Sequence, residues 1–279
     1  MFLQAIRASG QRVGAALRRV LWQGDHLAAD DQPAIATGFR RLNRELPGGG
    51  WPVGALTELL IPRAGIGEMR LLAPALRHLA AEDRWMVLVA PSSHDDSRPE
   101  PYGPALEQLG LKLDRLLVID TQHAADRLWA VEQALRCPGF GALLAWLPDA
   151  WPDQLRKLQL AAQGSEGLCF VMRPPTAQIE SSPSPLRLAC RAVRSSAVDA
   201  PTGINPHRIE VDIFKRRGPP LDFPLHLELP PLLAPAVSHA KPQSLDGLSP
   251  EIELSESSQS IPRRPAHVVD RPRLYAVAA

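Results

Sequence analysis

The feature that most constrains the fold is a regular alternation of short apolar runs and helical patterns over residues 55–172. The apolar runs occupy 55–61, 85–90, 116–119, 142–147 and 168–172, and the helical patterns occupy about 68–81, 103–109, 125–136 and 152–163. Each apolar run has the length of a strand that is buried on both faces. Strands that alternate with helices indicate an α/β fold, in which helices cover both faces of a mostly parallel sheet.

The pattern changes further along the chain, where apolar and polar residues alternate at 186–193, 208–214 and 225–229. A period of two is typical of strands with one solvated face, as in antiparallel sheets. We therefore expect the parallel sheet to be finished by half-exposed antiparallel strands. A polar stretch at 28–33 and the segments 37–39 and 46–52 are dense in glycine and proline, which predicts turns rather than helices or strands.

Composition divides the 279 residues into three parts. Residues 1–27 are predicted to form an N-terminal amphipathic helix, because apolar residues recur at helical spacing among arginines. Residues 28–230 hold the core domain. Residues 231–279 are rich in proline and serine and are predicted to be a disordered, flexible tail. The apolar cluster at 274–277 is the candidate docking segment of that tail.

The charge balance excludes a strongly basic nucleic-acid binder. Lys plus Arg total 31 and Asp plus Glu total 30, which leaves a formal net charge of +1. Contact with DNA is therefore expected only locally or through a partner. Cys137, Cys169 and Cys190 have neither metal-site nor disulfide-framework spacing. Since no apolar stretch approaches 18 residues, the sequence predicts no membrane segment and a cytoplasmic location.

The loop after the first buried strand is where a phosphate-binding loop would stand in such a sheet. Compared with the motif GxxxxGK[ST], Pro62 replaces the first glycine, Glu68 replaces the lysine that reaches the phosphates, and Met69 replaces the magnesium-binding hydroxyl. The carboxylate of Glu68 would repel a triphosphate. The sequence therefore predicts a vestigial phosphate loop that binds no nucleotide cofactor. Its residues are Pro62, Arg63, Gly65, Gly67, Glu68 and Met69.

Other chemical motifs do not appear in the sequence. The histidines lack HxxxH or HExxH spacing, and there is no GxSxG nucleophile motif. The run at 142–147 ends near Trp146, where an ATPase would place a metal-binding aspartate. We therefore expect no catalytic residue, no metal site and a protein that binds rather than catalyses.

Several segments together carry a resemblance to a known family. They are residues 20–25, 38–39, 46–52, 54–60, 65–70, 101–106 and 129–136. On these segments the chain resembles the SulA/ImuA group of RecA-like proteins over about residues 15–230, and within it the ImuA family of translesion accessory proteins most closely. Similarity to the recombinase itself extends to 109–118 and to the basic turn 214–220.

The resemblance implies a RecA-like three-layer sandwich and a non-enzymatic adaptor in damage-induced (SOS) translesion DNA synthesis. The implied partners are ImuB and an error-prone DNA polymerase, with RecA as a further candidate, and the implied location is the nucleoid when recruited. Trp129 and Leu135 of the family segment 129–136 fall at helical spacing and are expected in the core. The candidate partner-binding residues are Leu3, Ile6, Val13, Leu17, Lys215, Arg216, Arg217, Arg263, Arg264, Arg271, Arg273 and Tyr275.

Two other functions stay open. One is a SulA-like cell-division inhibitor that caps the tubulin-like septum polymer, against which the long tail argues, because the compact core would suffice for that activity. The other is a RecA-like ATPase with an atypical phosphate loop, against which Glu68 argues.

Overall fold

The computed structural model describes residues 33–91, 101–121, 123–194, 204–230 and 273–276. Within this part of the chain, nine strands form one sheet in the order β10-β9-β8-β3-β7-β6-β4-β5-β11. The strands are β3 (Leu56–Leu60), β4 (Trp85–Pro91), β5 (Leu116–Thr121), β6 (Phe140–Trp146), β7 (Leu168–Arg173), β8 (Leu186–Arg194), β9 (Ile204–Lys215), β10 (Leu225–Glu228) and β11 (Arg273–Ala276). The run from β8 to β5 is parallel throughout, and β9, β10 and β11 join it in antiparallel pairs.

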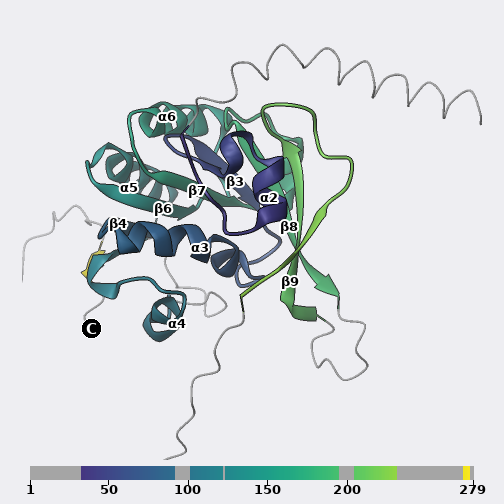
Figure 1. The fold of residues 1–279 in the computed structure, drawn as a ribbon. Coiled ribbons are helices and arrows are strands. Elements are labelled where there is room, and N and C mark those ends of the chain that lie inside the picture. Colours follow the sequence, from purple (N-terminus) through teal and green to yellow (C-terminus); the bar gives the residue numbers. More distant parts are fainter. Residues whose placement is uncertain (1–32, 92–100, 122, 195–203, 231–272, 277–279) are drawn as a thin grey trace, which may run out of the picture. The chain divides into compact units, whose positions relative to one another are not determined.

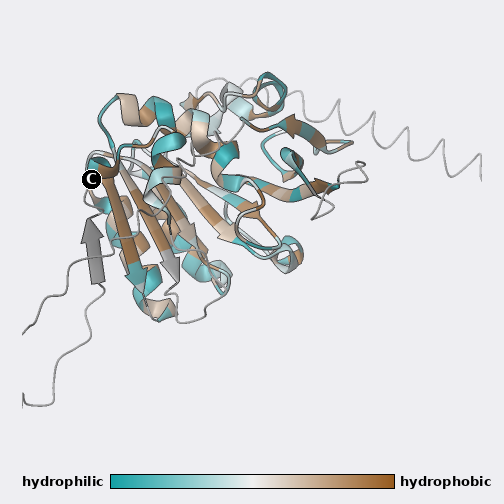
Figure 2. Cartoon of the chain, turned by 90° about the horizontal axis from the view of Figure 1, so that it is seen from below, coloured by the Kyte–Doolittle hydropathy of each residue, from teal (hydrophilic) through white to brown (hydrophobic). Residues whose placement is uncertain are grey.

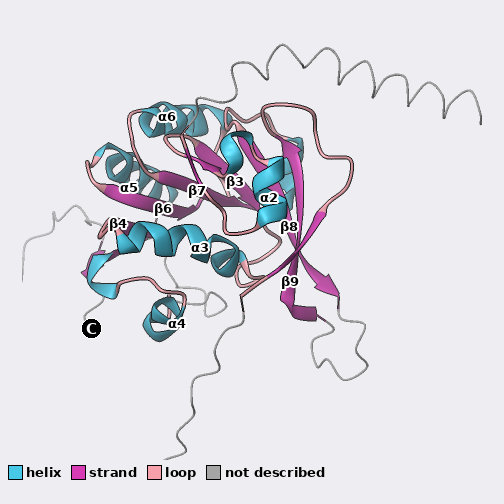
Figure 3. Ribbon diagram, in the orientation of Figure 1, coloured by secondary structure: helices cyan, strands magenta, loops and turns pink. Residues whose placement is uncertain are grey.

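Helices lie on both faces of this sheet, as Figures 1 and 3 show. They are α2 (Arg40–Glu45), α3 (Glu68–Ala81), α4 (Gly103–Gln108), α5 (Ala124–Arg136) and α6 (Pro152–Gln163), with short 3-10 helices η2 (Pro47–Gly49), η3 (Leu113–Arg115) and η4 (Pro175–Ile179). The bounds agree within two residues with the runs and helical patterns expected between 55 and 172. The α/β class with a mostly parallel sheet is confirmed.

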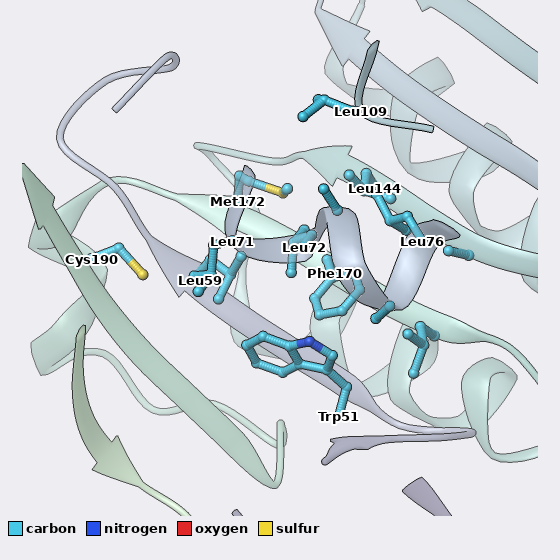
Figure 4. Packing of buried hydrophobic residues seen from close by; sticks show 14 of the residues in the cluster. Trp51, Leu59, Leu71, Leu72, Leu76, Leu109, Leu144, Phe170, Met172 and Cys190 are labelled. Carbon is cyan, nitrogen blue, oxygen red and sulfur yellow. The ribbon is translucent and has the colours of Figure 1, made fainter. Parts of the chain in front are cut away.

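Alternate residues along each strand supply two separate apolar layers, and Figure 2 shows the apolar character of the strands. Leu59 of β3 points into the layer shared with α2, α3 and α4, and Leu56 into the layer shared with α5 and α6. In the first layer Trp51 meets Phe170 edge to face, with ring centroids 5.3 Å apart (Figure 4). Both rings are fully buried, which fixes the strand before β3 against the sheet.

The expectation for residues 186–193 is partly wrong. Strand β8 pairs parallel with β3, and its first five residues, 186–190, are buried rather than alternately exposed. The reason is that Arg187, which gives the segment its polar alternation, is buried in an ion pair. Strands β9 and β10 are antiparallel and have the alternating exposure expected of a sheet edge.

Two further segments differ from the expectation. Residues 46–52, predicted to be a turn, contain strand β2 (Trp51–Pro52), which pairs antiparallel with β1 (Ala34–Ile35). Helix α2 and β1 lie between the predicted turns. Residues 273–276, predicted to be disordered tail, form strand β11 beside β5. The predicted helix at 1–27 and the tail from 231 to 272 lie outside the described residues.

Candidate functional site

The loop between β3 and α3 follows the carboxyl end of a central strand. Its residues 62–65 are exposed, whereas Gly67 and Glu68 are buried. Gly65 and Gly67 have φ angles of +83° and +114°, a left-handed conformation that glycine adopts without strain. Gly67 is also the N-cap residue of α3. The loop therefore leads into a helix amino terminus, whose N–H groups and dipole favour an anion.

The anion at this terminus is a side chain of the chain itself. The Glu68 residue is 2% exposed, and its Oε1 accepts a hydrogen bond from the Gly65 N–H at 2.7 Å. Its Oε2 accepts a second hydrogen bond from the Gly67 N–H at 3.1 Å. A phosphate group at this loop would compete for the same donors and would meet a negative charge. The role of Glu68 is thus wider than the repulsion argued from the sequence, because its carboxylate also holds the loop.

The loop is fixed from outside by residues of the last strands. The Arg70 guanidinium donates hydrogen bonds to the carbonyl groups of Pro206 and Pro230, and burial lowers its pKa. Leu229 packs so closely on Gly67 that a Cβ at that glycine would lie 2.5 Å from Leu229 Cδ1. These contacts hold the amino terminus of α3 against β9 and the end of β10.

The other residues of the predicted phosphate loop fall into two environments. Pro62 and Arg63 are exposed, and Met69 is partly buried against the main apolar layer. Arg63 therefore presents a cation on a loop whose backbone Glu68 immobilises. This combination of exposure and fixed backbone makes residues 62–65 a candidate contact surface.

A buried ionic cluster lies beside the same strand, and it was not among the sites predicted from the sequence. Glu58 of β3 has no exposed surface, and its Oε2 lies 3.2 Å from Arg187 Nε and 3.4 Å from Arg173 Nη1. The Ser182 hydroxyl donates to Oε1 of Glu58. Arg187 Nη2 also donates to the Ala177 carbonyl at 2.6 Å. The cluster ties η4 and the segment before β8 to the centre of the sheet.

A sequence signal for this cluster did exist. Glu58 interrupts an otherwise apolar run, and a charge in a buried strand needs an opposite charge nearby. The partners could not be found in the same way, because Arg173 and Arg187 lie 115 and 129 residues further along the chain.

The basic turn after β9 is largely engaged within the core. Lys215 Nζ donates to the Ser182 carbonyl at 2.6 Å, and burial lowers the pKa of Lys215. Arg216 forms an ion pair with Glu45 at 2.9 Å and donates to the Pro219 carbonyl. Arg217 is exposed. Of the three basic residues proposed for partner binding in this turn, only Arg217 presents its side chain mainly to solvent.

The two helices that cover the second apolar layer expose apolar side chains. Trp129 of α5 is 57% exposed and Leu160 of α6 is 64% exposed, so the expectation of a core Trp129 is wrong. It lies off the buried stripe of α5, to which Leu135 belongs as expected. A shallow pocket between the helices is lined by Glu132, Arg136, Lys157, Leu160 and Ala161.

Most of the other predicted partner-binding residues lie outside the described residues. These are Leu3, Ile6, Val13, Leu17, Arg263, Arg264 and Arg271. Arg273 and Tyr275 are the exceptions, because both belong to β11.

No group of three or more histidine, cysteine or acidic residues suited to a metal ion occurs among the described residues. The same part of the chain has no helix of the length and apolar character that spanning a membrane requires. Cys169 and Cys190 are buried, which raises the pKa of both thiols, that of Cys190 to about 12. Cys137 is exposed.

Comparison with known proteins places this arrangement in a family context. The family model "Cell division inhibitor SulA" matches residues 54–169. A cell division inhibitor SulA of Serratia proteamaculans is 27% identical over 121 residues, which is 43% of this chain and 68% of that protein. The protein of the same name from Photorhabdus laumondii is 31% identical over 113 residues, which is 40% of this chain and 60% of that protein. The one from Pectobacterium atrosepticum is 30% identical over 147 residues, which is 52% of this chain and 75% of that protein.

These matches correct the function predicted from the sequence. The prediction of an ImuA-type translesion adaptor is wrong, because the matching family model and these relatives are cell division inhibitors. The prediction of partners is wrong for the same reason. Those partners were ImuB, RecA and an error-prone polymerase, with indirect contact to DNA. The matches support the alternative, a SulA-like cell-division inhibitor, against which the long tail had been taken to argue.

Proposed function

Because the chain belongs to the SulA family, we propose that it is a cell division inhibitor that binds the tubulin-like polymer of the division septum. The observation that carries the proposal is the match over residues 54–169. These residues contain β3 to β6 and α3 to α6, which are four of the six strands of the parallel part of the sheet and helices from both of its faces. The similarity thus spans the structural core rather than a peripheral segment.

We further propose that inhibition is stoichiometric binding and not catalysis, carried out by a RecA-like fold in the cytoplasm. The β3–α3 loop supports this proposal, because the Glu68 carboxylate accepts hydrogen bonds from the N–H groups of Gly65 and Gly67, which a nucleotide phosphate would otherwise bind. An inhibitor that works by binding needs a rigid surface, and an internal carboxylate supplies that rigidity without a ligand.

The contact surface that we assign to the septum polymer is the exposed loop 62–65, with Arg63 as its charged centre. The loop lies within the matched region and is fixed by contacts on its buried side. The backbone of an immobile loop loses little conformational freedom on binding, so the entropic cost of placing Arg63 on an acidic surface is limited to its side chain.

The test is a sedimentation assay of GTP-driven septum polymer with the full chain added at increasing ratios. We expect the pelleted polymer to fall in proportion to the added chain. Arg63→Glu should raise the half-inhibitory ratio at least tenfold, which corresponds to about 1.4 kcal/mol, because the reversed charge replaces an attraction by a repulsion. Arg156→Glu is the matched control, because this exposed arginine lies on α6, away from the loop.

The possible failures are distinguishable. Unchanged polymer at a severalfold excess of the wild-type chain would contradict the proposed function. Inhibition that Arg63→Glu and Arg156→Glu affect equally would leave the function standing and would contradict the assignment of the loop as the contact surface.

A further inference from the structure

Strand β5 stands at one end of the parallel part of the sheet. Its only parallel neighbour in the described part of the chain is β4, so its other side would present unpaired N–H and C=O groups. The strand begins Leu-Leu-Val-Ile and has high β propensity. It contains neither proline nor lysine, the residues that commonly protect an edge. Left open, such an edge is a template for any extended chain.

A segment of the same chain lies on this edge. Residues 273–276 form β11, the yellow strand in Figure 1, which pairs antiparallel with β5. The register pairs all four residues of β11 with consecutive residues of β5, from Arg273 opposite Asp120 to Ala276 opposite Leu117. The added strand therefore covers residues 117–120 of the edge without a break.

We propose that the outer edge of β5 is a strand-binding surface, and that residues 273–276 of the same chain are its ligand, bound in cis by antiparallel strand addition. This inference goes beyond the proposed function and does not rest on it. It assigns a role to the apolar cluster at 274–277, which the sequence indicated as a docking segment without showing its receptor.

The length of the contact determines how it behaves. Four paired residues form a short strand, and such a segment binds weakly when it is a separate molecule. Tethering changes this, because the effective concentration of a ligand on the same chain is set by the connecting segment and not by the concentration of the protein. The edge is thus closed in cis but exchangeable, and another extended chain must compete with residues 273–276 to occupy it.

The first measurement is hydrogen exchange of the β5 amides in the full chain. In the wild type, the amides on both sides of β5 should be protected. In the variant Leu274→Pro with Tyr275→Pro, about every second amide of β5 should exchange at least tenfold faster, because proline lacks the N–H and disrupts strand pairing. The matched control is Val268→Pro with Val269→Pro, which carries two prolines outside β11 and should leave β5 unchanged.

The second measurement restores the ligand in trans. A synthetic peptide of residues 270–279, added at millimolar concentration to the Leu274→Pro, Tyr275→Pro variant, should slow exchange at the same β5 amides. Two further peptides carry an N-methyl group at Leu274 or at Tyr275. One of them should lose the protective effect and the other should keep it, since only alternate residues of an added strand bond to the edge.

Three results would overturn the proposal. The first is β5 exchange that is equal in the wild type and the proline variant. The second is an edge that opens in the variant but is not protected by the peptide. The third is a wild-type chain that light scattering shows to be a dimer and whose β5 protection falls on dilution, because the bound strand would then come from a second copy.

Discussion

Replacement of Glu68 by alanine tests whether the carboxylate is what holds the β3–α3 loop. Two hydrogen bonds to a charged acceptor are lost, and such bonds contribute about 1.5–3 kcal/mol each. Gly65 is exposed, so water can replace the carboxylate there, whereas Gly67 is buried and its N–H stays unpaired. One fully lost bond sets the expected decrease in the free energy of unfolding at about 2 kcal/mol.

Urea unfolding of the full chain, followed by far-ultraviolet circular dichroism, measures this decrease as a shift in midpoint at constant slope. The matched control is Glu132→Ala, which removes a helical glutamate whose ion pair with Arg136 lies at the surface. An i,i+4 pair of this kind contributes about 0.3–0.5 kcal/mol. Equal losses in the two variants would refute the reasoning, because the Glu68 carboxylate would then hold the loop no better than a surface pair.

Three other predictions follow from buried and exposed charges. Glu58→Gln should lower the free energy of unfolding by about 3–5 kcal/mol in the same assay, since it removes the carboxylate that pairs with buried Arg187 and leaves buried Arg173 with Glu180 alone; a loss below 1 kcal/mol would contradict the cluster. The pKa of Asp83 is lowered by hydrogen bonds from lysine and arginine side chains. Asp83 therefore stabilises the fold at a pH above its pKa in the unfolded chain, and this contribution is lost as the pH falls through its pKa in the folded chain. Asp83→Asn should make the free energy of unfolding depend less on pH over that range. A thiol reagent should modify Cys137 in the native chain, and Cys169 and Cys190 only after unfolding, because burial disfavours their thiolates.

The strands and helices between residues 55 and 172 could be predicted closely because each signal is local. An apolar run of strand length or a 3.6-residue period is contained within one segment. The parallel pairing of β8 could not be predicted in this way. Arg187 gives β8 a polar alternation, and only the position of Glu58, 129 residues earlier, shows that this arginine is buried.

The sequence predicted which residue is central to the candidate site, but not which contacts that residue makes. The sequence singled out Glu68 as the residue that disables a phosphate loop. That its carboxylate binds the loop's own N–H groups depends on the left-handed conformations of Gly65 and Gly67, which the one-dimensional pattern does not contain. Trp129 shows the opposite error, because an aromatic residue at helical spacing was assigned to the core and lies on the outer face of α5.

The function was mispredicted because the proline-rich tail was taken as a recruitment device. Shared core segments identified the group correctly, but a fold and its loops are compatible with several functions. Residues 273–276 lie on the edge of the chain's own sheet instead. A tail segment that is complementary to its own core is poor support for a separate partner.

Because Glu68 holds the β3–α3 loop, the order of this loop does not depend on a bound nucleotide. A loop ordered by ATP changes shape when the nucleotide is hydrolysed or scarce, and its surface reports that state. The β3–α3 loop takes its order from a covalently attached carboxylate, whose local concentration is fixed. We therefore expect a surface built on this loop to keep the same shape whether ATP is abundant or scarce, because its order comes from the chain itself.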